Sequence, residues 1–232
     1  MCYNPAVSLF TAIVEFALSG YMLFKYRLAT TRYFFATMLI VLGAYQFSEF
    51  MLCQTNSPEA WATVGFAIYT FLPALGLHGT MTCLGRKTKP FFLYAFPVFF
   101  VILAILYQNF ILLSQCQTIF VTVHNALFQT GNLSQTLLFS FYSLYYAGFI
   151  MWSCILCLIA FRKEPNFNRK RVLLLFPVGV IFMTLPTYVL MAMFPALNLR
   201  FPSVLCHFAL LLALIGFIGV RYEEKYLKKN IF

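Results

Sequence analysis

The feature that most constrains this chain is a series of apolar segments, each about as long as a membrane helix. A bilayer core about 30 Å thick needs roughly 20 apolar residues per spanning helix. Cutting the sequence at its charged and polar interruptions gives segments of that size near residues 5–25, 33–53, 61–84, 90–114, 136–161, 171–195 and 203–221. Because Gln108 and Asn109 interrupt the fourth segment near its end, six helices with a re-entrant piece are an alternative.

Composition supports the same class of protein. Of the 232 residues, 62% are hydrophobic and 9% are charged, and a soluble domain could not bury so much apolar surface. The first segment follows no basic region and contains Glu15, so we expect a retained membrane helix instead of a cleaved signal peptide. The sequence therefore predicts an all-α integral membrane protein, with residues 1–232 forming a single seven-transmembrane-helix bundle.

Lysine and arginine predict the orientation, because they concentrate in the cytoplasmic loops of membrane proteins. All 16 of them except Arg200 lie in the first, third and fifth loops or in the C-terminal tail. We therefore expect the N-terminus outside and the C-terminus in the cytoplasm. This asymmetry and anionic inner-leaflet lipid account for the net charge of +10 without a nucleic-acid partner. The expected partners are the lipid bilayer and either a second membrane protein or another copy of the chain.

The predicted topology brings thiol, imidazole and carboxyl groups from distant parts of the chain to the outer face. These residues are Cys2, Glu49, Cys53, Cys116, His124, Cys206 and His207. Cys83, Cys154 and Cys157 lie toward the cytoplasm, where we expect them to be packing residues. Packing and chance juxtaposition are also the alternative explanation for the outer set, because any bundle of this size brings some polar groups together.

Glu49 is the residue of this set that most strongly suggests a function. An ionisable group near the hydrocarbon boundary is costly unless it faces the bundle interior and finds a partner. Gln46 and Cys53 lie three positions before and four after it, on the same helix face. Glu15 lies deeper in the first segment and is either protonated, paired with a tyrosine hydroxyl or the lower end of an ion path. Tyr142, in the polar outer half of the fifth segment, is a further candidate for lining a ligand pocket with Gln46 and Glu49.

The long outer loop and the prolines within the spans describe the expected architecture around this site. The stretch "CQTIFVTVHNALFQ" partly alternates apolar and polar residues, which predicts a short ribbon that folds back over the helix ends as a lid. Pro73, Pro97, Pro177 and Pro186 should kink their helices, which neighbouring helices tolerate.

Four short motifs occur in the same order as in a known group of proteins. They are the opening "MCYNPAVS", the "AYQFSEF" of the second segment, the histidine of the outer loop and "RFPSVLCHFALLLALIGF" near the end. Together they resemble an uncharacterised family of bacterial polytopic membrane proteins that begin Met-Cys-Phe-Ser. Members also carry Gln-x-x-Glu near the end of the second helix, a lone histidine in a later loop and a Ser-Val-Trp-Cys-Phe-Phe-Ala-Ala segment.

The resemblance implies a bacterial inner membrane location and a shared site, without an established activity. The matching positions are Cys2, Ser8, Gln46, Glu49, His124 and Cys206. The chain departs from the family at Tyr3, Asn4 and Leu205, where members have Phe, Ser and Trp.

Two chemistries suit the outer set of residues. Cys2, Glu49, His124 and Cys206, with His207, match the ligand types of zinc or copper, although no local CxxC or HxxxH spacing supports a metal. Thiol redox chemistry is the alternative, because the outer face is oxidising and disulfides persist there. The cysteines could form structural bridges, for example between Cys53 and Cys116, or exchange electrons with a membrane quinone.

Other seven-helix functions lack their defining residues. The last span has no lysine for a retinal Schiff base, and it has only His207 where zinc-dependent lipid hydrolases carry two histidines. The chain has no nucleotide-binding loop, no zincin helix and no aspartate for a Ser-His-Asp triad, so no catalytic motif identifies an enzyme. Three hypotheses follow: a metal-binding or thiol redox protein, a small-molecule sensor or transporter with an ionisable path through Glu15 and Glu49, or a structural subunit of a larger membrane complex.

Overall fold

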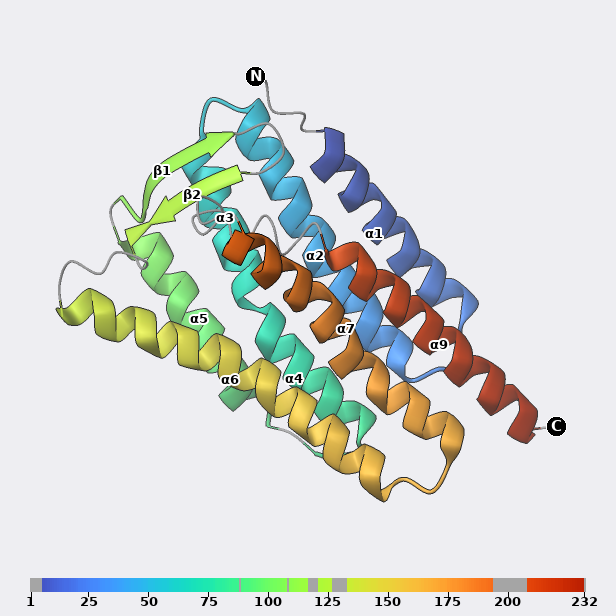
Figure 1. The fold of residues 1–232 in the computed structure, drawn as a ribbon. Coiled ribbons are helices and arrows are strands. Elements are labelled where there is room, and N and C mark those ends of the chain that lie inside the picture. The colour runs from blue at the N-terminus through green and yellow to red at the C-terminus, as the bar shows by residue number, and fades with distance from the viewer. Residues whose placement is uncertain are drawn as a thin grey trace.

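The computed structural model describes residues 6–87, 89–107, 109–116, 121–126, 133–193 and 208–231, and it is mostly helical (Figure 1). Its helices are α1 (Ala6–Lys25), α2 (Thr31–Gln54), α3 (Pro58–Thr70), α4 (Leu72–Cys83), α5 (Pro90–Leu106), α6 (Leu133–Lys163), α7 (Phe167–Met193) and α9 (Ala209–Ile231). An antiparallel hairpin of β1 (Ile111–Cys116) and β2 (Val121–Asn125) lies between α5 and α6. The α2 helix is central, because it contacts α1, α3, α4 and α9.

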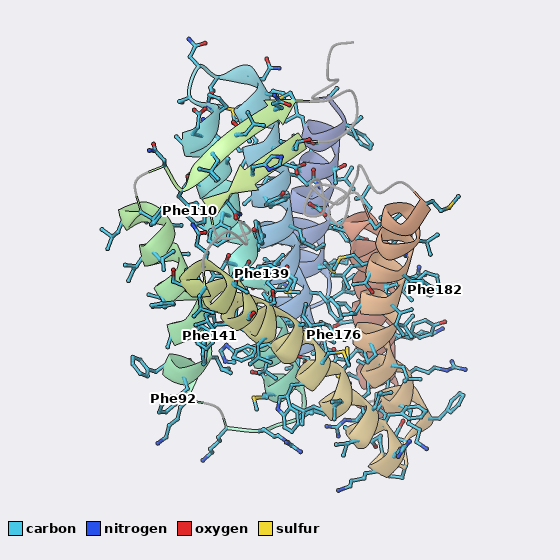
Figure 2. The ribbon with its side chains drawn as sticks, turned by 60° about the vertical axis from the view of Figure 1, so that its left-hand side comes forward. Phe92, Phe110, Phe139, Phe141, Phe176 and Phe182 are labelled. Carbon is cyan, nitrogen blue, oxygen red and sulfur yellow. A yellow bond between two sulfur atoms is a disulfide. The ribbon has the colours of Figure 1, made fainter. Side chains whose placement is uncertain are left out.

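The lengths and surfaces of the helices indicate a membrane protein. Four stretches are long and apolar enough to cross a bilayer, namely 6–25, 31–54, 58–83 and 133–163, and α5 is a shorter apolar helix. Large apolar side chains project away from the bundle, such as Phe92, 64% exposed, and Phe182, 54% exposed (Figure 2). Because water would not favour so many exposed rings, lipid contact explains this surface. Seven spans and the orientation stay predictions.

The α1 helix shows the membrane pattern most clearly, because its polar residues face inward. Ser8, Glu15 and Ser19 are 0–1% exposed, whereas Phe10 is 64% exposed and Phe24 is 78% exposed. Polar groups within the membrane are expected to face the interior of the bundle. The sequence predicted the helix at 5–25, but only the structure shows which face is buried.

The fourth predicted segment, 90–114, is wrong over its last eight residues, 107–114. The α5 helix ends at Leu106, and residues 111–116 form β1 instead of a helical turn. The backbone leaves the helix at Tyr107, which is extended with φ of −80° and ψ of 111°. Asn109 then adopts a left-handed conformation with φ of 58°, which Asn tolerates better than most residues. The ribbon predicted in the outer loop is present as β1 and β2. It begins at Ile111, before the stretch from Cys116 on which the prediction was based.

The third predicted segment, 61–84, is divided at Phe71 into α3 and α4. Pro73 lies in the first turn of α4, where its missing N–H is tolerated. Two tyrosines of α6 hold the break: Tyr145 Oη donates to the carbonyl oxygen of Thr70 at 2.7 Å, and the Tyr142 hydroxyl lies 3.1 Å from Thr70 Oγ1. The bond from Tyr145 gives the interrupted backbone a new partner, as a break inside a membrane requires, and the contact of Tyr142 is with the Thr70 side chain.

The two ends of the bundle differ in character. The hairpin lies at the same end as the start of α1 and the end of α2, and we call this the hairpin end (Figure 1). The α1–α2 and α6–α7 connections lie at the opposite end, together with the last turns of α9. There Glu223 of α9 accepts a hydrogen bond from the N–H of Thr31, the first residue of α2, and Glu224 accepts bonds from the N–H groups of Leu28 and Ala29 in the α1–α2 connection.

Candidate functional site

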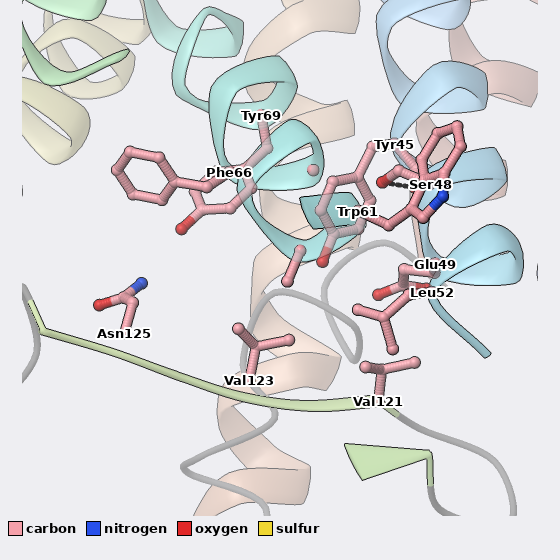
Figure 3. A pocket seen from close by; sticks show the side chains of 12 residues that line it. Tyr45, Ser48, Glu49, Leu52, Trp61, Phe66, Tyr69, Val121, Val123 and Asn125 are labelled. Carbon is pink, nitrogen blue, oxygen red and sulfur yellow. Dashed lines mark hydrogen bonds between the residues drawn. The ribbon is translucent and has the colours of Figure 1, made fainter. Parts of the chain in front are cut away.

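A small cavity lies between α2, α3 and β2 at the hairpin end (Figure 3). Its volume is about 30 Å³, and it is lined by Tyr45, Ser48, Glu49 and Leu52 from α2, by Trp61, Ala62, Gly65, Phe66 and Tyr69 from α3, and by Val121, Val123 and Asn125 from β2. Such a volume holds about one or two water molecules, whereas pockets for organic ligands measure roughly 300 Å³ or more. In this conformation the cavity therefore suits water or a small ion.

Local geometry explains why these residues meet. Tyr45, Ser48, Glu49 and Leu52 follow the helical spacing that puts them on one face of α2. Gly65 lets α3 approach this face, because a Cβ atom there would lie only 2.8 Å from Ser48 Oγ. On β2, alternate residues point to the same side of the strand, so Val121, Val123 and Asn125 face the cavity together.

A polar seam runs from this cavity along the contact between α1 and α2, and we define it as Ser8, Glu15, Gln46 and Glu49. Ser8 Oγ donates to Glu49 Oε2 at 3.4 Å, and Glu49 is only 3% exposed. Ser8 and Glu15 are both on α1, and their spacing puts Glu15 about two helical turns further into the bundle. The seam residues thus lie between the hairpin end, where Glu49 lines the cavity, and the middle of α1.

Glu15 and Gln46 are the most unusual members of the seam. They are 0% and 1% exposed, and neither the carboxylate oxygens of Glu15 nor the amide atoms of Gln46 have a hydrogen-bond partner among the described residues. Buried polar groups in native proteins nearly always have partners, including ordered water. A proton, a water molecule or a small cation would supply what these side chains lack.

A disulfide bond closes the hairpin end. Cys53, in the last turn of α2, is bonded to Cys116, the last residue of β1, with a Cα–Cα distance of 5.9 Å. This pairing is the example of a structural bridge that was predicted from the sequence. Both sulfur atoms are therefore occupied, and neither residue is a free thiolate for a metal.

The remaining predicted site residues are distributed as follows. Tyr142 is buried behind the cavity wall, where its ring stacks on Phe66 with centroids 5.6 Å apart. His124 lies on β2 between Val123 and Asn125, so strand alternation puts it on the face that points away from the cavity. Cys2, Cys206 and His207 lie outside the described residues. Among the residues that the structure describes, no group of three His, Cys, Asp or Glu side chains could hold a metal ion.

Of the residues that line the cavity, only Glu49 was a candidate site residue from the sequence, and three of those missed are instructive: Tyr69, Gly65 and Asn125. Tyr69 packs edge-on against Tyr45 with ring centroids 5.6 Å apart. A glycine in the aromatic stretch "WATVGFAIY" is a signal of close helix approach that could have identified Gly65. No sequence signal identifies Asn125, because its direction depends on the strand register.

The described part of the site thus combines the buried carboxyl groups of Glu15 and Glu49, the amide of Gln46 and a cavity large enough for about one or two water molecules. This set can hold a proton, water or a small cation, since carboxylate and amide oxygens are ligands for hard cations. Comparisons of this chain with protein-family models, with curated proteins and with solved structures found no match.

Proposed function

We propose that this chain is a membrane transporter or ion-responsive sensor in which protons or small cations pass between the outer cavity and the bundle interior through Glu49, Gln46 and Glu15. The observation that carries the proposal is the Glu15 carboxyl group, which is 0% exposed and has no hydrogen-bond partner among the described residues. Ionisable residues inside membrane bundles commonly mark proton relays or ion pathways.

A proton is the simplest partner for Glu15. Burying an ionised carboxylate without a partner is far more costly than burying the neutral acid, so the group is favoured in its protonated form unless a cation is bound. The adjoining cavity of about 30 Å³ admits water, which can pass protons between Glu49 and the seam. An organic solute would need a larger opening.

The proposed topology has seven spans, the N-terminus outside and the C-terminus in the cytoplasm. Basic residues in or directly beside the α1–α2, α4–α5 and α6–α7 connections support it, because these connections alternate with the hairpin end along the chain. The disulfide at the hairpin end also supports it, since disulfides persist on the oxidising side of the membrane. The proposal also includes a location in the bacterial inner membrane and membership of the family that the sequence resembles.

A transition-metal site at Cys2, Glu49, His124, Cys206 and His207 stays a prediction. Of the two members that the structure describes, Glu49 lines the cavity and His124 lies on the other face of its strand. The geometry of the described residues therefore favours the ionisable path over the metal site.

Ion flux in liposomes tests the proposed function. Purified protein is reconstituted with a pH-sensitive dye inside, and a potassium diffusion potential drives proton entry. We expect dye acidification with the wild type and at least a several-fold slower rate with Glu15→Gln or Glu49→Gln. Glu59→Gln is the matched control, because Glu59 is exposed in the first turn of α3. Wild-type flux no faster than that of empty liposomes, with both proton and sodium gradients, would contradict the proposal.

A further inference from the structure

The cavity is covered by a hairpin that is held at its two ends by different kinds of contact. At its base, Phe110 and Ile111 are buried, and Phe110 packs against Phe66 of α3 with ring centroids 4.8 Å apart. The Ala126 N–H donates to the carbonyl oxygen of Phe110 at 2.8 Å, which closes the base. At the other end of β1, Cys116 is covalently bonded to Cys53 of α2.

The hairpin forms one wall of the cavity, opposite Glu49. Val121 and Val123 lie across the cavity from Leu52 and Glu49 (Figure 3). Val121 pairs with Cys116 in the β-ladder, so the residue joined to the disulfide is the direct neighbour of a cavity residue. Movement of this end of the hairpin would therefore change access to Glu49.

The disulfide lies where a reductant can reach it. Cys116 is exposed and Cys53 is half-buried. Thiol–disulfide exchange depends on access of the attacking thiolate, and exposed disulfides are often the labile or regulatory ones. The free cysteines Cys83, Cys154 and Cys157 lie on α4 and α6, away from the hairpin end, so they are not positioned to exchange with it.

We propose that the Cys53–Cys116 disulfide is a reversible redox latch on the hairpin, and that its substrate is a dithiol on the outer face of the membrane. One thiolate of the dithiol attacks a sulfur of the protein disulfide, forms a mixed disulfide and releases the other cysteine as a thiol. The second thiolate of the dithiol resolves the mixed disulfide, so the dithiol is oxidised to a disulfide and two protein thiols form. Reduction frees the end of β1 while the base stays packed, and Glu49 becomes accessible.

The closing experiment measures access to Glu49 directly. Purified protein is treated with a water-soluble carbodiimide and an amine, and modification of each glutamate is measured by peptide mass spectrometry, with and without prior dithiothreitol. We expect several-fold more modification of Glu49 after reduction, while modification of the exposed Glu59 stays constant. The Cys53→Ser/Cys116→Ser variant should show the high level with or without dithiothreitol.

Two results would overturn the latch. One is equal modification of Glu49 in oxidised and reduced protein, and the other is a disulfide that dithiothreitol reduces only after the protein is denatured. The link between the latch and transport rests on the proposed function. Different results would contradict the latch proposal and the transport proposal. Redox-dependent modification without ion flux leaves the latch and removes the transport proposal, whereas Glu49-dependent flux that is the same in both redox states removes the latch alone.

Discussion

Glu224 Oε2 accepts a hydrogen bond of 3.0 Å from the backbone N–H of Ala29, which lies 195 residues earlier in the chain. The same oxygen accepts a bond of 2.8 Å from the N–H of Leu28, and Glu223 accepts one of 3.0 Å from the N–H of Thr31. The first N–H groups of a helix lack carbonyl partners and favour negative charge. Thr30, the residue before α2, makes no side-chain cap, so Glu223 supplies a carboxylate to the first N–H of α2, whereas Glu224 holds the α1–α2 connection that precedes this helix.

Replacing Glu224 with Gln should therefore destabilise the bundle. A neutral amide oxygen accepts these bonds less strongly, and hydrogen bonds to charged groups contribute about 1.5–3 kcal/mol. We expect a loss of about 1–2 kcal/mol in the free energy of unfolding. Denaturant titration in detergent measures the change, with the exposed Glu59→Gln as control. Equal stability of the two variants would show that Glu224 does not stabilise the α1–α2 connection.

The same contact predicts a dependence of stability on acid. Burial alone would raise the pKa of Glu224, but the N–H groups of Leu28 and Ala29 and the Lys228 ammonium, 3.3 Å away, outweigh it, so this pKa lies below its ordinary value of 4.5. A carboxyl whose folded-state pKa is lowered stabilises the fold above its unfolded pKa, and this contribution is lost as the pH falls through the folded-state pKa. We expect the wild type to lose stability below pH 4.5 and Glu224→Gln to lose less. Melting curves between about pH 3 and 7 measure both slopes, and parallel slopes would contradict the assignment.

Much of the helical framework could be predicted from apolar length alone. The segments predicted at 5–25, 33–53 and 136–161 correspond to helices at 6–25, 31–54 and 133–163. The error lies at 107–116, where "FILLS" continues the apolar run of α5. A short apolar stretch is compatible with a helix or a strand. Here the backbone is already extended at Tyr107, and residues 111–116 pair with β2.

The candidate site was predictable only where helical spacing determines it. The spacing of Gln46 and Glu49 indicated a shared face, and the structure confirms that both are buried. His124 was chosen as the chemically active residue of the loop, but strand alternation decides which side chains face the cavity, and a shift of one residue reverses the face. The partner of Cys53 could not be fixed either, because sequence spacing does not determine which outer cysteines meet.

The disulfide should also contribute to stability independently of any redox role. It closes a loop between residues that are 63 positions apart, and a native disulfide commonly contributes about 2–4 kcal/mol. We expect Cys53→Ser/Cys116→Ser to unfold at lower denaturant concentration than wild type. Cys154→Ser, at a half-buried free cysteine on α6, is the control and should change stability by less than about 1 kcal/mol. A double variant as stable as this control would mean that packing at Phe110 and Ile111 holds the hairpin by itself.

Orientation can be tested with an impermeant thiol reagent on intact cells. In a background without free cysteines, Ser134→Cys lies at the start of α6 near the hairpin end, and Phe167→Cys lies at the start of α7 at the opposite end. Both positions are exposed. Because basic loops stay in the cytoplasm, we expect labelling of Ser134→Cys and none of Phe167→Cys until the cells are permeabilised. The opposite pattern would put the Glu49 cavity on the cytoplasmic side and exclude the proposed outer entry.

Gly65 provides the sharpest test of whether the cavity matters. A Cβ atom at this position would lie 2.8 Å from Ser48 Oγ and 3.5 Å from Tyr45 Cε2, so a methyl group occupies space beside the cavity and moves the Ser48 hydroxyl. Displacing this hydroxyl weakens its 2.7 Å bond to the Tyr45 carbonyl oxygen, at a cost of about 1 kcal/mol. Alanine is also a better helix former than glycine by about 1 kcal/mol. The two effects offset each other, so Gly65→Ala should fold with nearly wild-type stability.

Its effect on function should be much larger, because a cavity of about 30 Å³ cannot accept a methyl group and keep its water. We expect Gly65→Ala to slow proton or cation flux in liposomes several-fold, although Glu15, Gln46 and Glu49 are all retained. Gly148→Ala in α6 is the matched control, since a Cβ atom there meets nothing within 4 Å and should leave both flux and stability unchanged. If Gly65→Ala conducts as well as Gly148→Ala while its melting temperature stays at the wild-type value, ions do not pass through the cavity, and the entry to Glu15 lies elsewhere along α1.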